Sequence, residues 1–333
     1  MKRIGNLIEA ISSHENMRIA FWRAKKGKSH RLDVQAFASN LDGNLNRLGA
    51  SLRVGDLNVG KYEQFKIFDP KERLITAPCF EERVLHHAII NICGPIIDRW
   101  MIFDTYACRQ GKGREAAVKR AQEFSKQNPW FLKLDIRKYF DSIAQDVLLG
   151  KLSRLFKDPI LHNCFGVIVK TYSSTPGMQI GIPIGSLTSQ YFANFYLGWL
   201  DRFVKESLRV KAYVRYMDDM ILWGESHAQL VQWLNEIRNY LANDLQLELR
   251  ATPFVNKSTK GVDFLGARIF KSHVTLNRSS RVRLRNGILM LEKVAATGEI
   301  NENELQQRST AMIAFATSGR TKSWRYRSNL ISS

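Results

Sequence analysis

Apolar positions recur at the spacings of helices and strands along most of the chain. Residues 1 to about 50 carry apolar side chains at partial helical spacing, which predicts a helical N-terminal segment. Residues 62–77 alternate apolar and polar side chains around Asp69 and Pro70, a turn signal, and this pattern predicts two short strands joined by a hairpin. A helix is expected next, because apolar residues between positions 84 and 92 share one face.

The middle of the chain has three further patterned segments. Residues 130–140, WFLKLDIRKYF, predict a strand that leads into a turn or a helix. Residues 187–204 place apolar side chains on one helical stripe, with Ser186 as a candidate N-cap. Residues 212–224, AYVRYMDDMILWG, predict two apolar strands that flank a tight Asp-Asp turn.

The charge balance narrows the function classes. The chain has 333 residues, with 50 Lys and Arg against 31 Asp and Glu, and its net charge of +19 and pI near 9.9 are typical of a nucleic-acid binder. From Arg250 onward there are fifteen basic and five acidic residues, and in residues 319–331 Arg and Lys interleave with Trp324 and Tyr326. We expect a lobe that grips nucleic acid, with a solvated basic tail as the alternative.

Composition argues against several other classes. Hydrophobic residues make up 44% of the chain and charged residues 24%, as in ordinary globular proteins, so disorder throughout is not expected. The four Cys residues have no CxxC spacing and form no zinc-type array with the seven His residues, which indicates a reduced, cytoplasmic protein. The N-terminus lacks the apolar run of a signal peptide or membrane span, so no membrane role is expected.

Three carboxylates are candidates for metal chemistry. Asp218 and Asp219 lie between two apolar strands and Asp135 ends a third, so the three would meet if the strands are neighbours. Carboxylate oxygens are the ligands that Mg²⁺ prefers, and a pair of such ions can drive phosphodiester synthesis. The backbone carbonyl of Ile136 is a further candidate ligand. The alternative is that each Asp caps a helix or fills a turn.

Motifs around these carboxylates resemble those of reverse transcriptases. Residues 216–219, YMDD, resemble the YxDD box, and residues 135–141, DIRKYFD, resemble the first palm motif. Residues 181–197, between them, resemble the motif that binds template and incoming nucleotide. Further matches lie at residues 71–75 and 105–118, similar to fingers motifs, and at residues 261–266, similar to the primer-grip hairpin.

The resemblance implies a right-hand polymerase of the α/β (α+β) class. Its palm would be an antiparallel sheet with a ferredoxin-like core, and its thumb would be small and helical. The expected parts are an N-terminal helical extension at 1–60, fingers at 61–130, a palm at 131–275 that includes part of the fingers at about 145–180, and a basic thumb at 276–333.

The resemblance also implies the site residues of an RNA-directed DNA polymerase. Asp135, Asp218 and Asp219 would be catalytic and, with Ile136, would bind two Mg²⁺ ions, which Mn²⁺ can replace. The residues expected to contact substrate are Arg73, Arg109, Lys112, Phe140, Ile184, Gly185, Gln190, Tyr216 and Met217.

Individual roles follow from the motif positions. Phe140 occupies the steric-gate position, where an aromatic ring excludes a ribose 2′ hydroxyl, so DNA is the expected product; a plain core aromatic is the alternative. Arg73, and Arg109 with Lys112, are candidates for phosphate contacts. Ile184 stands where retroviral enzymes carry a Gln, which indicates either looser nucleotide selection or packing against the nascent base pair.

Within the family, the combination of YMDD, GIPIGSLTSQ and TYACRQGKG most resembles the reverse transcriptases of diversity-generating retroelements in bacteria and their phages. That resemblance implies error-prone copying of a template RNA into cDNA, with a primer, dNTPs and a small basic accessory protein as partners. Antiphage-defence enzymes are the main alternative, followed by retron and group II intron relatives. A catalytically inactive RNA-binding scaffold is the alternative outside enzymes.

Overall fold

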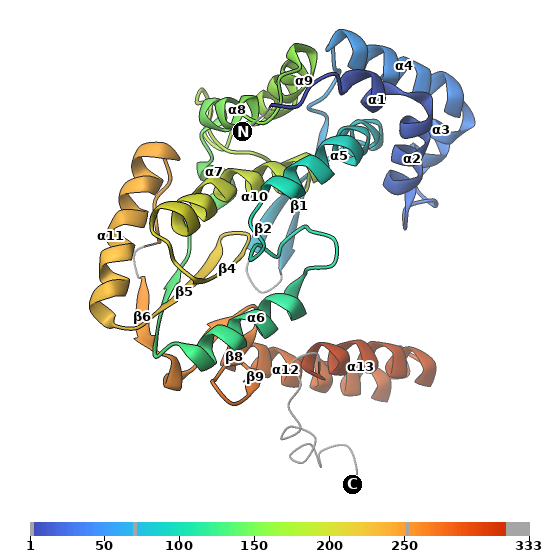
Figure 1. The fold of residues 1–333 in the computed structure, drawn as a ribbon. Coiled ribbons are helices and arrows are strands. Elements are labelled where there is room, and N and C mark those ends of the chain that lie inside the picture. Colours follow the sequence, from blue (N-terminus) through green and yellow to red (C-terminus); the bar gives the residue numbers. More distant parts are fainter. Residues whose placement is uncertain (1–2, 69–71, 251–252, 318–333) are drawn as a thin grey trace. The chain divides into compact units, whose positions relative to one another are not determined.

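The chain forms two compact units, each assembled from three separate stretches of sequence. The computed structural model describes residues 3–68, 72–250 and 253–317. Unit 1 comprises residues 1–103, 136–203 and 237–250, and unit 2 comprises residues 104–135, 204–236 and 251–333. Figure 1 shows the elements of both units in chain order.

Unit 1 is mainly helical. Its N-terminal part contains α1 (Ile8–Ser12), α2 (His14–Lys25), α3 (Leu32–Ser39) and α4 (Leu41–Val54), which confirms the predicted helical segment. The long helix α5 (Phe80–Trp100) follows, as the apolar spacing predicted, and packs along α2. The ring of Phe80 at its start contacts Phe21 and Phe37, so an aromatic cluster fixes the N-terminal helices onto α5.

The predicted hairpin is confirmed in unit 1. Strands β1 (Tyr62–Phe68) and β2 (Glu72–Pro78) pair antiparallel, and the predicted Asp69-Pro70 turn lies outside the described residues. The remaining elements of this unit are α7 (Tyr139–Ser142), α8 (Gln145–Ser153), α9 (Pro159–Lys170), α10 (Leu187–Arg202) and most of the second half of α11 (His227–Asp244). Helix α10 begins at the predicted N-cap, because the Ser186 hydroxyl accepts a hydrogen bond from the Ser189 N–H.

A four-stranded antiparallel sheet organises unit 2. It contains β3 (Trp130–Leu134), β4 (Ala212–Tyr216), β5 (Asp219–Gly224) and β6 (Phe254–Lys257) in the order β4-β5-β3-β6. With α10 between β3 and β4 in the chain and α11 between β5 and β6, this is the connectivity of a ferredoxin-like core. The sequence predicted β3, β4 and β5, whereas β6 was not predicted.

One face of this sheet packs against helix α6 (Arg114–Gln127) and a second, three-stranded sheet of β7 (Val262–Phe264), β8 (Ala267–Ile269) and β9 (Val274–Leu276). Apolar side chains of all three parts form one buried core. The β7–β8 hairpin falls where residues 261–266 resemble the primer grip. Two short helices complete the connections: the π-helical turn η1 (Phe203–Ser207) after α10 and the 3₁₀ turn η2 (Ser258–Lys260) before β7.

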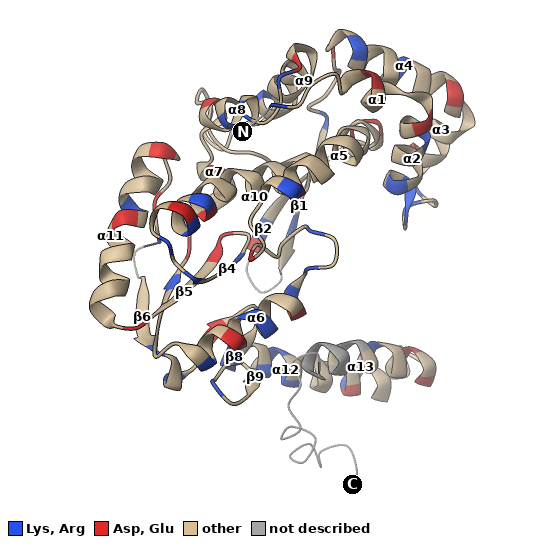
Figure 2. Cartoon of the chain, in the orientation of Figure 1, with Lys and Arg blue, Asp and Glu red and all other residues tan. Residues whose placement is uncertain are grey.

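Unit 2 ends in the helices α12 (Arg278–Ala296) and α13 (Glu302–Thr317), at the position of the predicted helical thumb. Asn277 caps α12 by accepting a hydrogen bond from the Ser280 N–H, and four Arg residues recur along the first turns of this helix (Figure 2). The basic tail at residues 319–331 lies outside the described residues.

No helix in the described part of the chain is long and apolar enough to cross a bilayer. The expected domain boundaries stay a prediction.

Candidate active site

The hairpin of β4 and β5 carries two of the three candidate carboxylates, Asp218 and Asp219. Tyr216 pairs with Asp219, so the connection is a two-residue turn of Met217 and Asp218, in which Met217 has a positive φ of 54°. The Arg215 guanidinium, which is fully buried, donates a hydrogen bond of 2.9 Å to the Met217 carbonyl. The predicted tight turn is therefore present, but its residues are Met217 and Asp218 rather than the two aspartates, because Asp219 already belongs to β5. The buried Arg215 charge in β4 holds the backbone of the turn.

The third carboxylate lies at the end of the neighbouring strand. Strand β3 pairs with β5 in an antiparallel register whose last pair is Leu134 with Met220. Asp135 is the next residue along the chain, and Asp219 is the corresponding neighbour on β5. The register therefore places Asp135 and Asp219 opposite each other at one end of the sheet.

A lysine lies beside these carboxylates on the same face of the sheet. Lys133 precedes Asp135 by two residues, so the two side chains point to the same side of β3. The Lys133 Nζ atom lies 3.1 Å from Oδ1 and 3.2 Å from Oδ2 of Asp219, and it donates a hydrogen bond of 2.7 Å to the Asp263 carbonyl. Lys133 therefore links β3, β5 and β7 at the candidate site.

The surroundings of Asp219 disfavour its negative charge. A quarter of the side chain is exposed, but its Oδ1 atom is buried and has no partner with hydrogen-bond geometry. Burial raises the pKa of Asp219 to about 6; the Lys133 ammonium opposes this shift, and the Asp135 and Asp218 carboxylates add to it. A cation close to all three carboxylates would stabilise the charged form of Asp219 and offset the effect of burial and of the neighbouring carboxylates.

The donor chemistry at this end of the sheet fits a hard divalent cation. Asp219 offers a buried carboxylate oxygen without a hydrogen bond, and Asp135 and Asp218 add carboxylates close enough to shift its pKa. The three are not drawn together into a finished cluster: within the described ranges, no three His, Cys, Asp or Glu side chains have an arrangement that would hold a metal ion. Mutual repulsion of carboxylates explains such spacing.

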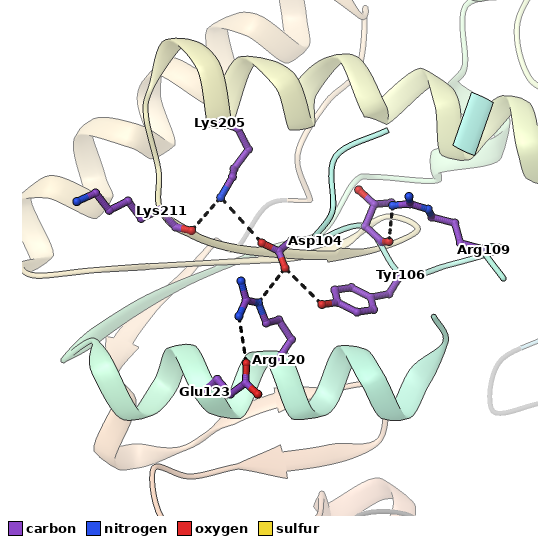
Figure 3. A network of polar contacts seen from close by, with 8 residues as sticks. Asp104, Tyr106, Arg109, Arg120, Glu123, Lys205 and Lys211 are labelled. Carbon is purple, nitrogen blue, oxygen red and sulfur yellow. Dashed lines mark hydrogen bonds and ion pairs between the residues drawn. The ribbon is translucent and has the colours of Figure 1, made fainter. Parts of the chain in front are cut away.

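A buried network fixes the segment before α6 (Figure 3). The Asp104 carboxylate accepts hydrogen bonds from Arg120 Nε at 2.9 Å and the Tyr106 hydroxyl at 3.3 Å, and Lys205 Nζ lies 4.0 Å away. Lys205 also donates to the Lys211 carbonyl at 2.8 Å. The Asp104 carboxylate is almost fully buried and pairs with Arg120 of α6 and Lys205 of η1. It therefore connects α6 to the segment around η1.

The same segment carries two predicted phosphate contacts and runs along β4. The Arg215 N–H donates to the Asp104 carbonyl and the Tyr106 N–H donates to the Arg215 carbonyl, both at 3.0 Å. The Arg109 guanidinium donates to the Thr105 carbonyl at 3.0 Å, and Lys112 Nζ lies 5.0 Å from the centre of the Tyr106 ring. Arg109 and Lys112 thus belong to a loop that is tied to the strand leading into the YMDD turn.

In unit 1, the loop of residues 180–185 contains the predicted positions Ile184 and Gly185 and contacts a third, Phe140. The Ile182 N–H donates to the Phe140 carbonyl at 3.0 Å, and the Thr76 N–H donates to the Ile184 carbonyl at 2.7 Å. Gly185 has a φ of +124°, and a Cβ atom there would lie 3.0 Å from the Thr76 carbonyl oxygen. Glycine is therefore required because strand β2, which also carries Arg73, passes against the loop.

A buried polar chain lies behind this loop. The Ser186 hydroxyl is 3.2 Å from His86 Nδ1, and His86 Nε2 is 3.5 Å from Glu82 Oε1. Burial lowers the pKa of His86 to about 3, so this imidazole is held neutral, and burial also raises the pKa of Glu82. An adjoining cavity of about 170 Å³ is lined by Pro78, Arg83, His86, His87, Gly185, Leu187 and Gln190.

The predicted site residues divide between the two units. Unit 2 contains Asp135, Asp218, Asp219, Tyr216, Met217, Arg109 and Lys112. Unit 1 contains Arg73, Ile136, Phe140, Ile184, Gly185 and Gln190. Within unit 1, Ile136 is buried and forms a bridge with Leu249, while Phe140 is half-buried against Tyr139. The functional role of each of these residues stays a prediction.

Sequence reasoning missed three residues that the structure places at these sites. Lys133 and Arg215 lie inside apolar strands next to the carboxylates, and His86 interrupts the apolar stripe of α5. The sequence did contain a signal for these residues. Each is a charged or polar residue at a position where the apolar pattern predicts burial, which is uncommon without a partner.

A comparison with protein-family models identifies the family of this chain. The family model described as reverse transcriptase (RNA-dependent DNA polymerase) matches residues 67–269, well over half of the chain. The chain belongs to the reverse transcriptase family. The match covers both units, including all three candidate carboxylates. Membership confirms the mixed α/β polymerase class that the sequence predicted, and divalent metal ions are the general cofactors of this family.

The chain is similar to longer proteins whose names refer to introns. It is 21% identical over 216 residues to a COX1/OXI3 intron 1 protein of Saccharomyces cerevisiae, covering 62% of this chain and 26% of the relative. It is 21% identical over 290 residues to the group II intron-encoded protein LtrA of Lactococcus lactis subsp. cremoris, covering 65% of this chain and 47% of the relative. The chain therefore spans about a quarter to a half of the length of these relatives.

Solved telomerase structures are also similar. Telomerase of Candida albicans with a fragment of telomeric RNA has 11% identity and a TM-score of 0.47, covering 80% of this chain and 58% of that chain. A truncated apo telomerase of Candida tropicalis has 13% identity and a TM-score of 0.48, covering 65% and 55% of the two chains.

Proposed function

We propose that this chain is an RNA-directed DNA polymerase that copies a template RNA by two-metal nucleotidyl transfer. One observation carries the proposal: the β3–β5 register sets Asp135 opposite Asp219, directly beside the turn that bears Asp218. Membership of the reverse transcriptase family and the net charge of +19 support a nucleic-acid substrate.

Asp135, Asp218 and Asp219 would hold two Mg²⁺ ions, or Mn²⁺ in their place, with the Ile136 carbonyl as a further ligand. When bound, these ions make the primer 3′ hydroxyl a better nucleophile and stabilise the charge that develops on the departing pyrophosphate. The Arg215 contact to the Met217 carbonyl keeps the turn in place for this arrangement.

The remaining predicted residues would act on the nucleotide and the template. Phe140 would exclude a 2′ hydroxyl, and its backbone hydrogen bond to Ile182 ties it to the loop of Ile184 and Gly185. Phosphate contacts are proposed for Arg73, Arg109 and Lys112, and contacts with the nascent base pair or the nucleotide for Ile184, Gly185, Gln190, Tyr216 and Met217.

Primer extension on an RNA template tests the proposal. We expect the parent chain to extend a DNA primer with dNTPs and Mg²⁺, and Asp218→Ala to reduce the rate at least about a hundredfold, because the turn loses a metal ligand. RNA binding should stay within about threefold of the parent, since the basic surface is unchanged.

Glu225→Ala is the matched control, because it removes an exposed carboxylate just beyond the other end of β5. It should extend the primer at the parent rate. Equal rates for the parent and Asp218→Ala would contradict the proposal, and absence of extension with RNA binding retained would support the inactive-scaffold alternative.

The finer proposal is error-prone copying for a diversity-generating retroelement, assisted by a small basic accessory protein. The apolar Ile184, at a position where the retroviral enzymes carry a hydrogen-bonding Gln, supports loose nucleotide selection. Similarity to LtrA favours a group II intron-type enzyme as the second candidate. Antiphage defence is a third assignment, which no contact among the described residues favours.

Sequencing the cDNA separates these candidates. On an RNA template that contains all four bases, a diversity-generating enzyme should place its errors mainly opposite adenine. An intron-type enzyme should copy all four bases with similar accuracy, and that outcome would contradict the finer proposal while leaving RNA-directed synthesis intact. Untemplated product would favour the defence assignment.

A further inference from the structure

Lys133 is a charged residue inside an otherwise apolar strand. Its neighbours in β3, Leu132 and Leu134, are fully buried, and its own side chain is 27% exposed. Because side chains alternate along a strand, Lys133 shares a face with Asp135 and lies diagonally across from Asp219 on β5. The strand therefore brings an ammonium group to the carboxylates.

The Lys133 ammonium occupies the coordinating side of Asp219. Its Nζ atom is close to both carboxylate oxygens, at 3.1 and 3.2 Å, so neither oxygen points away from it. In the described part of the chain, Lys133 is the only cationic side chain in contact with Asp219. The 2.7 Å hydrogen bond to the Asp263 carbonyl anchors the same ammonium to β7.

An ammonium and a divalent cation compete for one carboxylate. Both are attracted to the same oxygens, and they repel each other strongly at contact distance in a half-buried site. A metal ion that uses Asp219 must therefore displace Lys133 from at least one oxygen. The Asp263 carbonyl gives the displaced ammonium a place to remain, because that hydrogen bond does not involve Asp219.

We propose that Lys133 is the resident counter-ion of Asp219, which a divalent cation displaces when it binds. The inference rests on the proposed function, since it takes Asp219 as a metal ligand. Lys133 holds the carboxylate in place before the metal arrives and sets the metal concentration that the site requires. The ion exchange also changes the link between β5 and the β7–β8 hairpin.

Mn²⁺ binding to the full chain, without nucleic acid or nucleotide, tests this role. Electron paramagnetic resonance of free Mn²⁺ gives the dissociation constant directly. Lys133→Met should lower that constant by roughly three- to tenfold, because the competing charge is removed. Lys133→Gln is carried in parallel as a polar substitution of similar length, and it should give the same shift.

Three comparison variants assign the effect. Lys126→Met removes an equal charge from an exposed position on α6 and should leave Mn²⁺ affinity unchanged. Lys133→Arg keeps the charge and should bind Mn²⁺ no more tightly than the parent. Adding Asp219→Asn to Lys133→Met should abolish the increase in Mn²⁺ affinity. That result would show that the increase depends on Asp219.

Unchanged or weaker Mn²⁺ binding by both Lys133→Met and Lys133→Gln would overturn the counter-ion role, as would an equal gain in Lys126→Met. The result is independent of polymerase activity. If the parent chain extends no primer while Lys133→Met binds Mn²⁺ more tightly, the proposed function fails and the counter-ion role stands. If the parent extends the primer normally and neither Lys133 variant changes the affinity, the proposed function stands and the counter-ion role fails.

Discussion

His86 is a residue whose environment sets a measurable pH dependence. Its side chain is 1% exposed, and burial lowers its pKa from 6.5 to about 3. The unfolded chain therefore binds a proton on this histidine between these two values, and the folded chain does not. Stability is lost as the pH falls through 6.5, and the loss continues towards 3. The raised pKa of Glu82 acts in the opposite direction, because just above pH 4.5 the folded chain binds this proton more readily than the unfolded chain does.

Urea unfolding at two pH values isolates the contribution of His86. Between pH 7 and pH 5 the parent should lose about 2 kcal/mol more of its free energy of unfolding than His86→Gln, because only the parent has this proton uptake on unfolding. His30→Gln, at an exposed position, should behave as the parent. The same pH slope in all three proteins would show that His86 is not held neutral by burial.

At the residue scale, the carboxylates could be predicted and their partners could not. Asp135, Asp218 and Asp219 stand at the ends of apolar strands, a pattern that is local in sequence. Lys133 and Arg215 were missed because their roles depend on contacts with Asp219 and the Met217 carbonyl, which require the register of β3 and β5 and the shape of the turn. The local pattern of apolar and polar residues does not specify how β3 and β5 are aligned with each other.

The Asp104 network acts at the scale of elements. Asp104→Ala should lower the free energy of unfolding by about 2–3 kcal/mol, because it leaves Arg120 and Lys205 without their shared, almost fully buried carboxylate. The loss should appear in chemical denaturation of the full chain.

Glu123→Ala is the control, since the Glu123 side chain is only partly buried on α6 and pairs there with Arg120. Its cost should stay below about 1 kcal/mol. A cost for Asp104→Ala no larger than that of the control would mean that the network does not hold α6 against the segment around η1.

Apolar periodicity predicted the longer elements but not the short or polar ones, and the β7–β8 hairpin was expected only from the resemblance of residues 261–266 to the primer grip. The hairpin of β1 and β2, the strands β3 to β5 and the helices α5 and α10 all follow apolar spacings in the sequence. Helix α6 was missed because its sequence, REAAVKRAQEFSKQ, is mostly polar and becomes fixed by packing on the sheet. Strands β6 to β9 have three or four residues each, too few to establish an alternation.

At the scale of the whole molecule, each unit is built from three separate stretches of the chain. These units are discontinuous in the sequence, and the parts expected at 1–60, 61–130, 131–275 and 276–333 stay a prediction. The family motifs were still recognisable, because each is local. The central claim of the proposed mechanism is that Asp135, Asp218 and Asp219 of unit 2 together hold two metal ions at a primer end.

Anomalous diffraction from a complex of the chain with RNA template, DNA primer, a non-hydrolysable dNTP and Mn²⁺ tests that claim most directly. The proposal predicts two manganese peaks about 4 Å apart, bound by Asp135, Asp218 and Asp219, with the nucleotide phosphates beside them. Manganese bound away from these carboxylates, or a nucleotide bound away from them, would contradict it.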